Sequence, residues 1–429
     1  MRNPAVPRRR GSVSVQLVVI MVPVIFGLMG FAVDLGRLYS IKSELKAAAN
    51  AAALAAAARL IGTEASTADA TAAALLTVET ATGRGNKYNF GGVTVGQTDG
   101  TLQSEMPDPV FYQAVADATG TNASVGGGAG EVSGSMAKYV KVSIRGEAPL
   151  LFWGLLAVAT ERKTPVEVSA VAGMSAPLCT ACAIEPLAVA AVDAGDTTDF
   201  GFVLNTKYTL GFQCTGAPTP SIISGTTQRI PYLLLNRYDE NATLFPDESQ
   251  QAYRIGAQGL LPSNNPLMAC LQIASADGET VWVNAAPVAC SQSRVPSPVG
   301  ALMCGLYARF DQVVPDSCTS VPEVDIMSQA YLPDTDLADA EDYAAYLGTG
   351  RRVITVPIVE ALSTGDPMVV LGFRQFLVGP DPAAAVGINP GDQNGRFVAL
   401  YIGSVMPLKQ GRFDGCLQTA GPGKVVLHQ

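Results

Sequence analysis

The sequence predicts an α+β protein with one N-terminal transmembrane helix that continues into a long exported helix. An α+β region and a β-rich antiparallel C-terminal domain are expected to follow. Two observations predict this fold class. The first is an uncharged stretch of 23 residues, Gly11–Val33, which runs without a turn signal into a strongly helix-forming sequence. The second is a change after about residue 183, where Pro and Gly recur and β-branched runs replace helical patterns.

The uncharged stretch is long enough to cross a bilayer. At about 1.5 Å per residue it extends about 35 Å, whereas a hydrocarbon core is about 30 Å thick. Only a helix can cross alone, because it satisfies its backbone groups internally. A cleaved secretory signal is the alternative, but its apolar region is shorter and ends at a small-residue site. Here Asp34 and a continuing helix follow directly.

Basic residues before the stretch predict its orientation. Arg2 and the cluster Arg8–Arg10 precede it, and no acidic residue lies among them. Because loops rich in Lys and Arg stay on the cytoplasmic side, we expect a single-pass membrane protein with a cytoplasmic N-terminus. Everything after Asp34 is then exported.

The chain divides into four predicted parts. Residues 1–33 form the basic N-terminus and the transmembrane helix, and 34–62 form the helix continuing from the membrane. Residues 63–178 form an α+β region with a helix at Ser66–Thr82, and 179–429 form the β-rich, cysteine-containing exported domain. The elements expected in that domain are the strands Phe200–Leu204, Ile230–Leu235, Thr280–Val283, Arg351–Val359, Met368–Val378 and Gly395–Val405 and the helix Leu337–Leu347.

Composition argues against several functions. The net charge of −9 argues against a nucleic-acid partner, and a single histidine, His428, excludes His-centred triads and His metal clusters. We therefore expect no enzyme, no catalytic residue, no cofactor and no metal site. One acidic cluster loses the alternation of a calcium loop after its first pair, and it suits a helix N-terminus better. Its members are Asp334, Asp336, Asp339, Glu341 and Asp342.

The cysteines predict disulfides. Their number is even and all lie on the expected exported side, which indicates an oxidising compartment. A zinc half-site or a redox pair at Cys179 and Cys182 remains an alternative, although no second C-x-x-C is present. A bridge between these two would close a very tight loop, so distant partners are favoured. The eight cysteines are Cys179, Cys182, Cys214, Cys270, Cys290, Cys304, Cys318 and Cys416.

The helix after the membrane carries a packing stripe at alternating spacings of three and four. Its residues are Leu38, Ile41, Leu45, Ala48, Ala52 and Ala55, whereas Ala51 and Ala57 lie off it. The stripe packs either on the protein's own globular part or on a partner's equivalent helix. The second alternative would make the chain an oligomer through its N-terminal helix.

The segments RRRGSVSVQ and VDLGRLYSIKSELKAAANAAALAAAA resemble the N-terminal region of TadG-like proteins of the Flp (Tad, tight adherence) pilus-assembly family. Lys46 and Asn50 depart from the family's usual Gln and Asp. The resemblance covers about 50 residues and implies a membrane-anchored structural component of a Flp pilus or related secretion apparatus, with other Tad proteins as partners. It also implies that the helix crosses the bacterial inner membrane and that the C-terminal region is exported to the periplasm or the cell surface. The matching residues are Asp34, Gly36, Arg37, Tyr39, Leu45, Ala48, Ala49, Ala51, Ala52, Ala53, Leu54 and Ala55.

The same resemblance points to a processing site. Related pilin-like proteins are cut by a prepilin peptidase after a Gly that precedes the apolar span, and they commonly carry Glu at the fifth mature position. Here the junction is Gly11–Ser12 and the fifth position is Gln16. Because Gln16 cannot neutralise an ammonium group in lipid, we expect incomplete or no cleavage and an accessory anchor rather than a shaft subunit. The alternative function is a tethered exported binding module for a polysaccharide or surface ligand.

Overall fold

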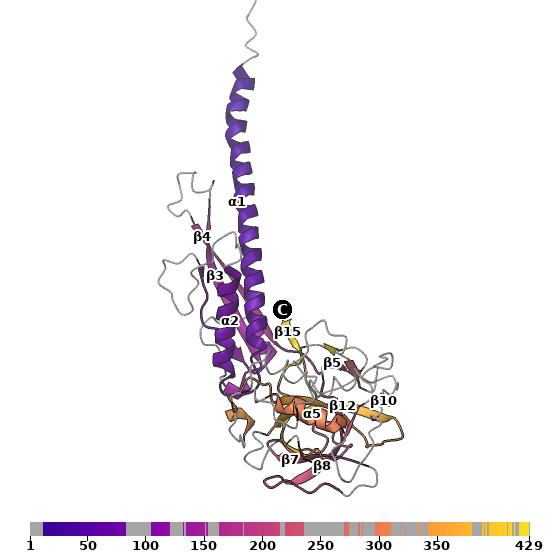
Figure 1. The fold of residues 1–429 in the computed structure, drawn as a ribbon. Helices are drawn as coiled ribbons and strands as arrows, with labels where there is room; N and C mark the ends of the chain where they lie inside the picture. Colours follow the sequence, from indigo (N-terminus) through magenta and orange to yellow (C-terminus); the bar gives the residue numbers. More distant parts are fainter. Residues whose placement is uncertain are drawn as a thin grey trace, which may run out of the picture.

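The protein consists of one long helix, an N-terminal body packed along that helix, and a larger β domain (Figure 1). The computed structural model describes residues 12–82, 104–120, 132, 134–150, 152, 163–182, 184–214, 219–235, 270–273, 282–283, 285, 297–309, 318, 334, 336, 342–379, 388–389, 391–392, 394–409, 411–413, 416 and 420–428. The fold class is the α+β arrangement predicted above.

Helix α1 spans Ser12–Ala57 without interruption, so the apolar stretch and the alanine-rich stretch form one helix of 46 residues. Alanine is the best helix former, which explains the persistence of the C-terminal half. Gly62 then reverses the chain at a φ of +80°, a conformation that Gly adopts without strain. Helix α2, Ser66–Thr82, returns beside α1 with the bounds expected from the sequence (Figure 1).

The N-terminal body contains a five-stranded sheet. Its centre is a long antiparallel hairpin in which β3 and β4 pair from Tyr139↔Gly173 to Pro149↔Lys163. Helix α3 (Val115–Thr119) and the 3-10 turn η1 (Gly134–Met136) lie between β2 and β3 in the chain. The strands are β1 (Ser104–Glu105), β2 (Val110–Tyr112), β3 (Tyr139–Pro149), β4 (Lys163–Met174) and β15 (Val425–His428).

The C-terminal half of α1 packs on this sheet. Leu45, Ala49 and Ala52 are fully buried and share one core with the sheet residues Val142 and Ala170. Small side chains let the helix and strand backbones approach closely, so packing here depends on the absence of bulk. The stripe predicted from the sequence is narrower than the buried face, which also includes Ala53, Ala56 and Ala57. The expectation that Ala57 lies off the packed face is wrong, whereas Ala51 is exposed.

The C-terminal domain is built on a seven-stranded sheet in the order β10-β12-β11-β6-β8-β7-β13. Because β13 also pairs with β12, six of these strands close into a barrel. Consecutive β11, β12 and β13 are antiparallel as predicted, whereas β6–β11 and β7–β8 are parallel pairs. The strands are β6 (Leu187–Ala190), β7 (Lys207–Phe212), β8 (Gln228–Leu234), β10 (Trp282–Val283), β11 (Val353–Val359), β12 (Met368–Val378) and β13 (Phe397–Gly403).

Two expectations for this domain are wrong. Phe200–Leu204 forms turns, because Phe200 and Gly201 adopt φ values of +55° and +79°. The carboxylate of Asp196 holds this turn by accepting backbone N–H groups, including that of Gly201 at 3.0 Å. Of the helix expected at Leu337–Leu347, residues 337–341 lie outside the described residues, and the rest forms only the 3-10 turn η3, Tyr343–Ala345.

Helix α5, Ser297–Tyr307, was not predicted. Its residues Val299, Leu302 and Leu306 are fully buried in the core of the barrel domain. A disulfide joins Cys304 of this helix to Cys318. The bridge therefore ties α5 to the segment that follows it.

The C-terminal domain lies between β4 and β15 in the chain, so a two-stranded neck joins it to the N-terminal body. The outgoing segment donates Ser175 N–H to the Lys424 carbonyl at 2.9 Å and Leu178 N–H to the Pro422 carbonyl at 3.0 Å. A disulfide between Cys179 and Cys416 closes the neck. It confirms that Cys179 pairs with a distant cysteine, and Cys182 and Cys214 are disulfide-bonded as well. The neck leads into a small sheet of β5 (Thr180–Cys182), β9 (Cys270–Gln272) and β14 (Gly411–Arg412).

A second joint connects the end of α1 with the barrel domain. The hydroxyl of Tyr343 donates to the Ile61 carbonyl at 2.9 Å, and Glu64 N–H donates to the Ala344 carbonyl at 2.8 Å. Ile61 and Tyr343 also belong to one apolar cluster with residues of β11, β12 and β13. The barrel domain is thus connected to the N-terminal body at two places, the neck and the C-terminal end of α1.

We predict that Ala52→Leu lowers the thermal unfolding midpoint of the full chain in detergent, whereas Ala51→Leu changes it little. Ala52 is fully buried and Ala51 is exposed on the same turn. Overpacking a close-packed site costs about 1–3 kcal/mol, and surface changes usually stay within about 0.5 kcal/mol. Equal midpoints for the two variants would contradict the packing of this helix face on the sheet.

Candidate membrane anchor and helix surface

The N-terminal half of α1 is exposed and apolar on all sides. Between Val15 and Val33 the large apolar side chains are 44–68% exposed. Figure 1 shows this end of the helix projecting beyond the other elements. The segment has the length and composition of a membrane-crossing helix. A bilayer provides the apolar solvent that such a surface requires.

The predicted processing positions lie at the start of this helix. Gly11 lies outside the described residues, Ser12 is the first residue of α1, and Gln16 is exposed on its surface. Cleavage at Gly11–Ser12 stays a prediction.

Asp34 is the first charged residue after the apolar segment, and it points inward. Only 5% of it is exposed, and its Oδ2 accepts the backbone N–H of Phe152 at 3.0 Å. Phe152 lies beyond the end of β3, so this bond connects the helix with the closed end of the β3–β4 hairpin. A hydrogen bond to an ionised carboxylate is stronger than a neutral one. In contrast, Tyr39, five residues further along the helix, is 66% exposed.

Gly30 lets the hairpin approach the helix. A Cβ placed on Gly30 would lie 2.7 Å from Cβ of Phe152, closer than real carbon atoms approach. Gly30 is also buried, unlike the apolar residues around it. A Cβ on Gly27, one turn earlier, would meet nothing within 4 Å. The close approach of Phe152 therefore requires glycine at position 30. We call the three residues that connect the helix with the hairpin, Gly30, Asp34 and Phe152, the hairpin brace.

The predicted stripe packs within the protein. Ile41, Leu45 and Ala52 are buried in the core between α1 and the sheet, and Leu38 and Ala48 pack against that core. Ala55 is half-buried and does not belong to this core. The surface of α1 that is left for a partner lies elsewhere, at exposed positions such as Leu35, Tyr39 and Ala51.

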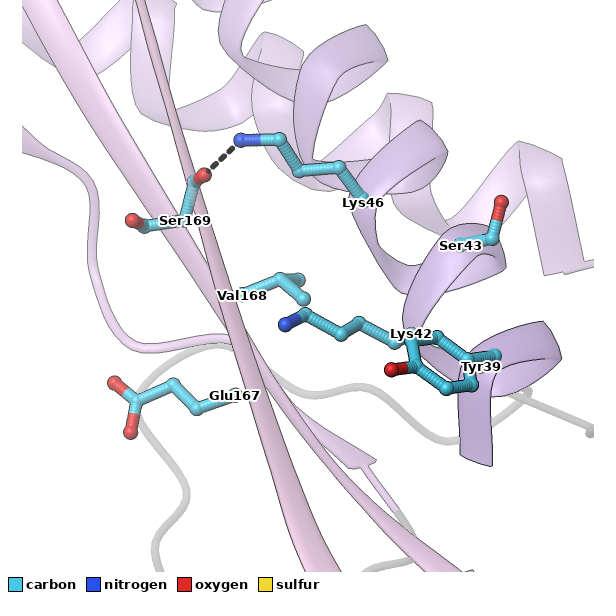
Figure 2. A pocket seen from close by; sticks show the side chains of 7 residues that line it. All are labelled: Tyr39, Lys42, Ser43, Lys46, Glu167, Val168 and Ser169. Atoms are coloured by element: carbon cyan, nitrogen blue, oxygen red, sulfur yellow. Dashed lines mark hydrogen bonds between the residues drawn. The ribbon is translucent and has the colours of Figure 1, made fainter. Parts of the chain in front are cut away.

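A shallow groove of about 520 Å³ lies between α1 and β4. Figure 2 shows Lys42 and Lys46 reaching from the helix toward the strand, where Lys46 Nζ donates to the Ser169 carbonyl at 2.5 Å. Glu167 pairs instead with Arg145 of the neighbouring strand at 3.3 Å. Lys42 follows Asp34 by eight residues, about 12 Å along the helix. The groove is lined by Tyr39, Lys42, Ser43, Lys46, Glu167, Val168 and Ser169.

A buried ion pair stabilises the barrel domain. Arg309 Nη2 lies 2.6 Å from Glu185 Oε2, and both side chains are at most 1% exposed. Burial raises the pKa of Glu185 above its ordinary value, and the guanidinium of Arg309 offsets part of that rise. Arg309 also donates to the Arg351 carbonyl at 2.8 Å. Because the pair is enclosed and connects separate segments, we interpret it as a structural cross-link.

The acidic cluster of the C-terminal domain is engaged with protein donors. Asp339 and Glu341 lie outside the described residues, and the carboxylates of the other three members each accept hydrogen bonds. Asp334 is fully buried. The donors are Tyr346 Oη and Arg352 N–H for Asp334, Leu347 N–H for Asp336, and Ala344 N–H and Asn205 Nδ2 for Asp342.

We predict that Gly30→Ala releases the hairpin brace, whereas Gly27→Ala does not. Both changes raise helix propensity by about 1 kcal/mol, so their difference reports the contact with Phe152. Amide hydrogen exchange of the full chain in detergent should accelerate about tenfold near Phe152 in Gly30→Ala, because overpacking costs about 1–3 kcal/mol. Unchanged exchange in both variants would show that Gly30 does not support the brace.

Comparison with known proteins finds one family model that matches α1. Residues 11–59 match the model of the Tad family, described as Flp pilus-assembly TadE/G-like. No curated protein and no solved structure matches the chain. The match covers all of α1, including the exposed apolar half and the packed alanine-rich half. The resemblance noted at Asp34, Gly36, Arg37 and Tyr39 is thus confirmed: residues 11–59 of this chain are similar to the TadE/G-like Flp pilus-assembly family.

Proposed function

We propose that this protein is a membrane-anchored structural component of a Flp (Tad) pilus or of a related secretion apparatus. Residues 12–33 cross the bacterial inner membrane, and the body and barrel domain lie outside the cytoplasm. The observation that carries the proposal is the family match at residues 11–59, which falls on a helix with an exposed apolar half.

Two further observations support it. The disulfides Cys179–Cys416 and Cys304–Cys318 suit an oxidising compartment. The basic cluster Arg8–Arg10 suits a cytoplasmic N-terminus.

The proposed role is assembly, not catalysis. In the described part of the barrel domain, Glu185 is enclosed in an ion pair and Asp334 is fully buried among protein donors. Groups used in this way stabilise a fold and are not presented to a substrate. Partners of this protein are then other Tad assembly proteins, reached through the exposed side of α1 and the surface of the barrel domain.

The first test concerns topology. Fusions after Gln429 should be active with alkaline phosphatase, which folds only outside the cytoplasm, and dark with a fluorescent protein that matures only in the cytoplasm. Changing Ile20 and Ile25 together to Arg should abolish membrane insertion, because each central Arg costs about 2.5–3.5 kcal/mol on insertion scales. The matched pair Ile20→Leu and Ile25→Leu should insert normally. An inactive phosphatase fusion together with a fluorescent second fusion would refute export.

The second test concerns partners. The full chain, purified from membranes of cells that carry the pilus machinery, should bring Tad assembly proteins with it. A chain in which residues 12–33 are replaced by an unrelated transmembrane helix should remain in the membrane and bind fewer of these partners. Partners retained at the same level would place the interaction in the body or the barrel domain. No Tad partner, together with binding of a surface polysaccharide, would instead support a tethered binding module.

A further inference from the structure

The closed end of the β3–β4 hairpin lies at the depth where the apolar segment of α1 ends. Strand pairing reaches Pro149↔Lys163, and Phe152 lies three residues after Pro149. Its backbone N–H is bonded to Asp34, and its side chain lies on Gly30. Gly30 precedes Asp34 by four residues, which places it about 6 Å further along the helix toward the N-terminus. The ring of Phe152 therefore stands beside the uncharged segment of the helix, not beside the charged one.

The depth of this contact can be compared with a bilayer. The uncharged segment is about 35 Å long, about 5 Å more than a hydrocarbon core. Its C-terminal end therefore reaches the boundary between acyl chains and headgroups. Gly30 lies within that end, so Phe152 lies at the same boundary, where the apolar faces of interfacial segments bury Phe and Leu side chains.

The surface at this point is apolar. Phe152 is 45% exposed although it contacts the helix, and Leu150 is half-buried. In the sequence both belong to an uncharged stretch, Ala148–Thr160, and the charged residues Glu161, Arg162 and Lys163 follow it. An apolar surface that continues directly into a membrane-crossing helix is covered by the same lipid that surrounds the helix. This continuity identifies lipid as the partner of the surface at Leu150 and Phe152.

We propose that the closed end of the β3–β4 hairpin, at Leu150 and Phe152, is a second membrane contact of this protein. It enters the leaflet through which α1 leaves the bilayer. This inference rests on the proposed membrane anchoring of α1. Two contacts, the helix and the hairpin end, fix the rotation of the body about the helix axis, which one helix cannot do. The body therefore presents a constant face to its neighbours along the membrane.

Single tryptophan probes test the contact. Trp153 and Trp282 are the only two tryptophans, and both are changed to Phe in the full chain. One Trp is then introduced as Phe152→Trp, as Leu150→Trp, as Phe26→Trp within the apolar segment, or as Met136→Trp. Met136 is 51% exposed and precedes β3 at the opposite end of the hairpin. Because β3 rises about 3.4 Å at each of its ten steps, Met136 lies about 34 Å from the closed end.

The chain is placed in vesicles of phosphatidylcholine and phosphatidylglycerol whose acyl chains carry bromine, and Trp fluorescence is compared with that in unbrominated vesicles. We expect strong quenching at position 26, quenching at least half as strong at positions 152 and 150, and almost none at position 136. Two separate hairpin probes are used because either tryptophan alone could disturb the local structure, and agreement between them excludes that explanation.

Each other outcome is decisive. If position 26 is quenched while 150 and 152 behave like 136, the second contact is refuted and the anchor stands. If position 26 is not quenched, membrane anchoring itself fails. If probes 150 and 152 remain unquenched in vesicles and shift to shorter wavelength only in the native assembly, a protein occupies this surface and the lipid proposal is overturned.

Discussion

The continuity of α1 through Asp34 is the constraint on which the rest of the structure depends. One helix must expose an apolar surface on every side before this residue and bury a single face after it. The change requires different side chains in the two halves: large aliphatic ones up to Val33, and alanines along the buried face beyond Leu45. Because alanine offers little area for burial, the second half depends on close approach to the sheet and on length. A hairpin as long as β3–β4 supplies both.

Asp34 lies where the helix changes from an exposed apolar surface to a buried face, and its buried carboxylate needs a hydrogen-bond donor there. A carboxylate at the end of an apolar segment, only 5% exposed, must be satisfied by nearby donors. The N–H of Phe152 provides one, at the point where the hairpin would otherwise separate from the helix. The charged residue therefore holds the apolar hairpin end in place, and Gly30 leaves the space in which that end fits.

Local signals predicted much of this fold, and contacts between distant segments account for what they missed. The apolar run, the alanine run and the Ser and Gly boundaries identified α1 and α2, and β-branched runs identified β11, β12 and β13. Helix α5 could have been found, since Pro298 follows Ser297 and apolar residues recur at Val299, Leu302, Met303 and Leu306. Closure of the barrel and the hairpin brace were beyond reach. The brace joins residues that are 118 positions apart in the chain, and no sequence pattern in either segment predicts its contact with the other.

The position of β15 has a consequence for biogenesis. This strand pairs with the edge of β4, beginning at Val425↔Met174, so two neighbours in one sheet are separated by 425 − 174 = 251 residues. Ribosomes add about 5–20 residues per second, so the edge of β4 waits about 10–50 s for its partner while the whole barrel domain is made. Unpaired strand edges recruit other chains. A cell that makes this protein therefore needs either a chaperone that covers β4 during this interval, or synthesis that starts so seldom that two nascent copies rarely meet.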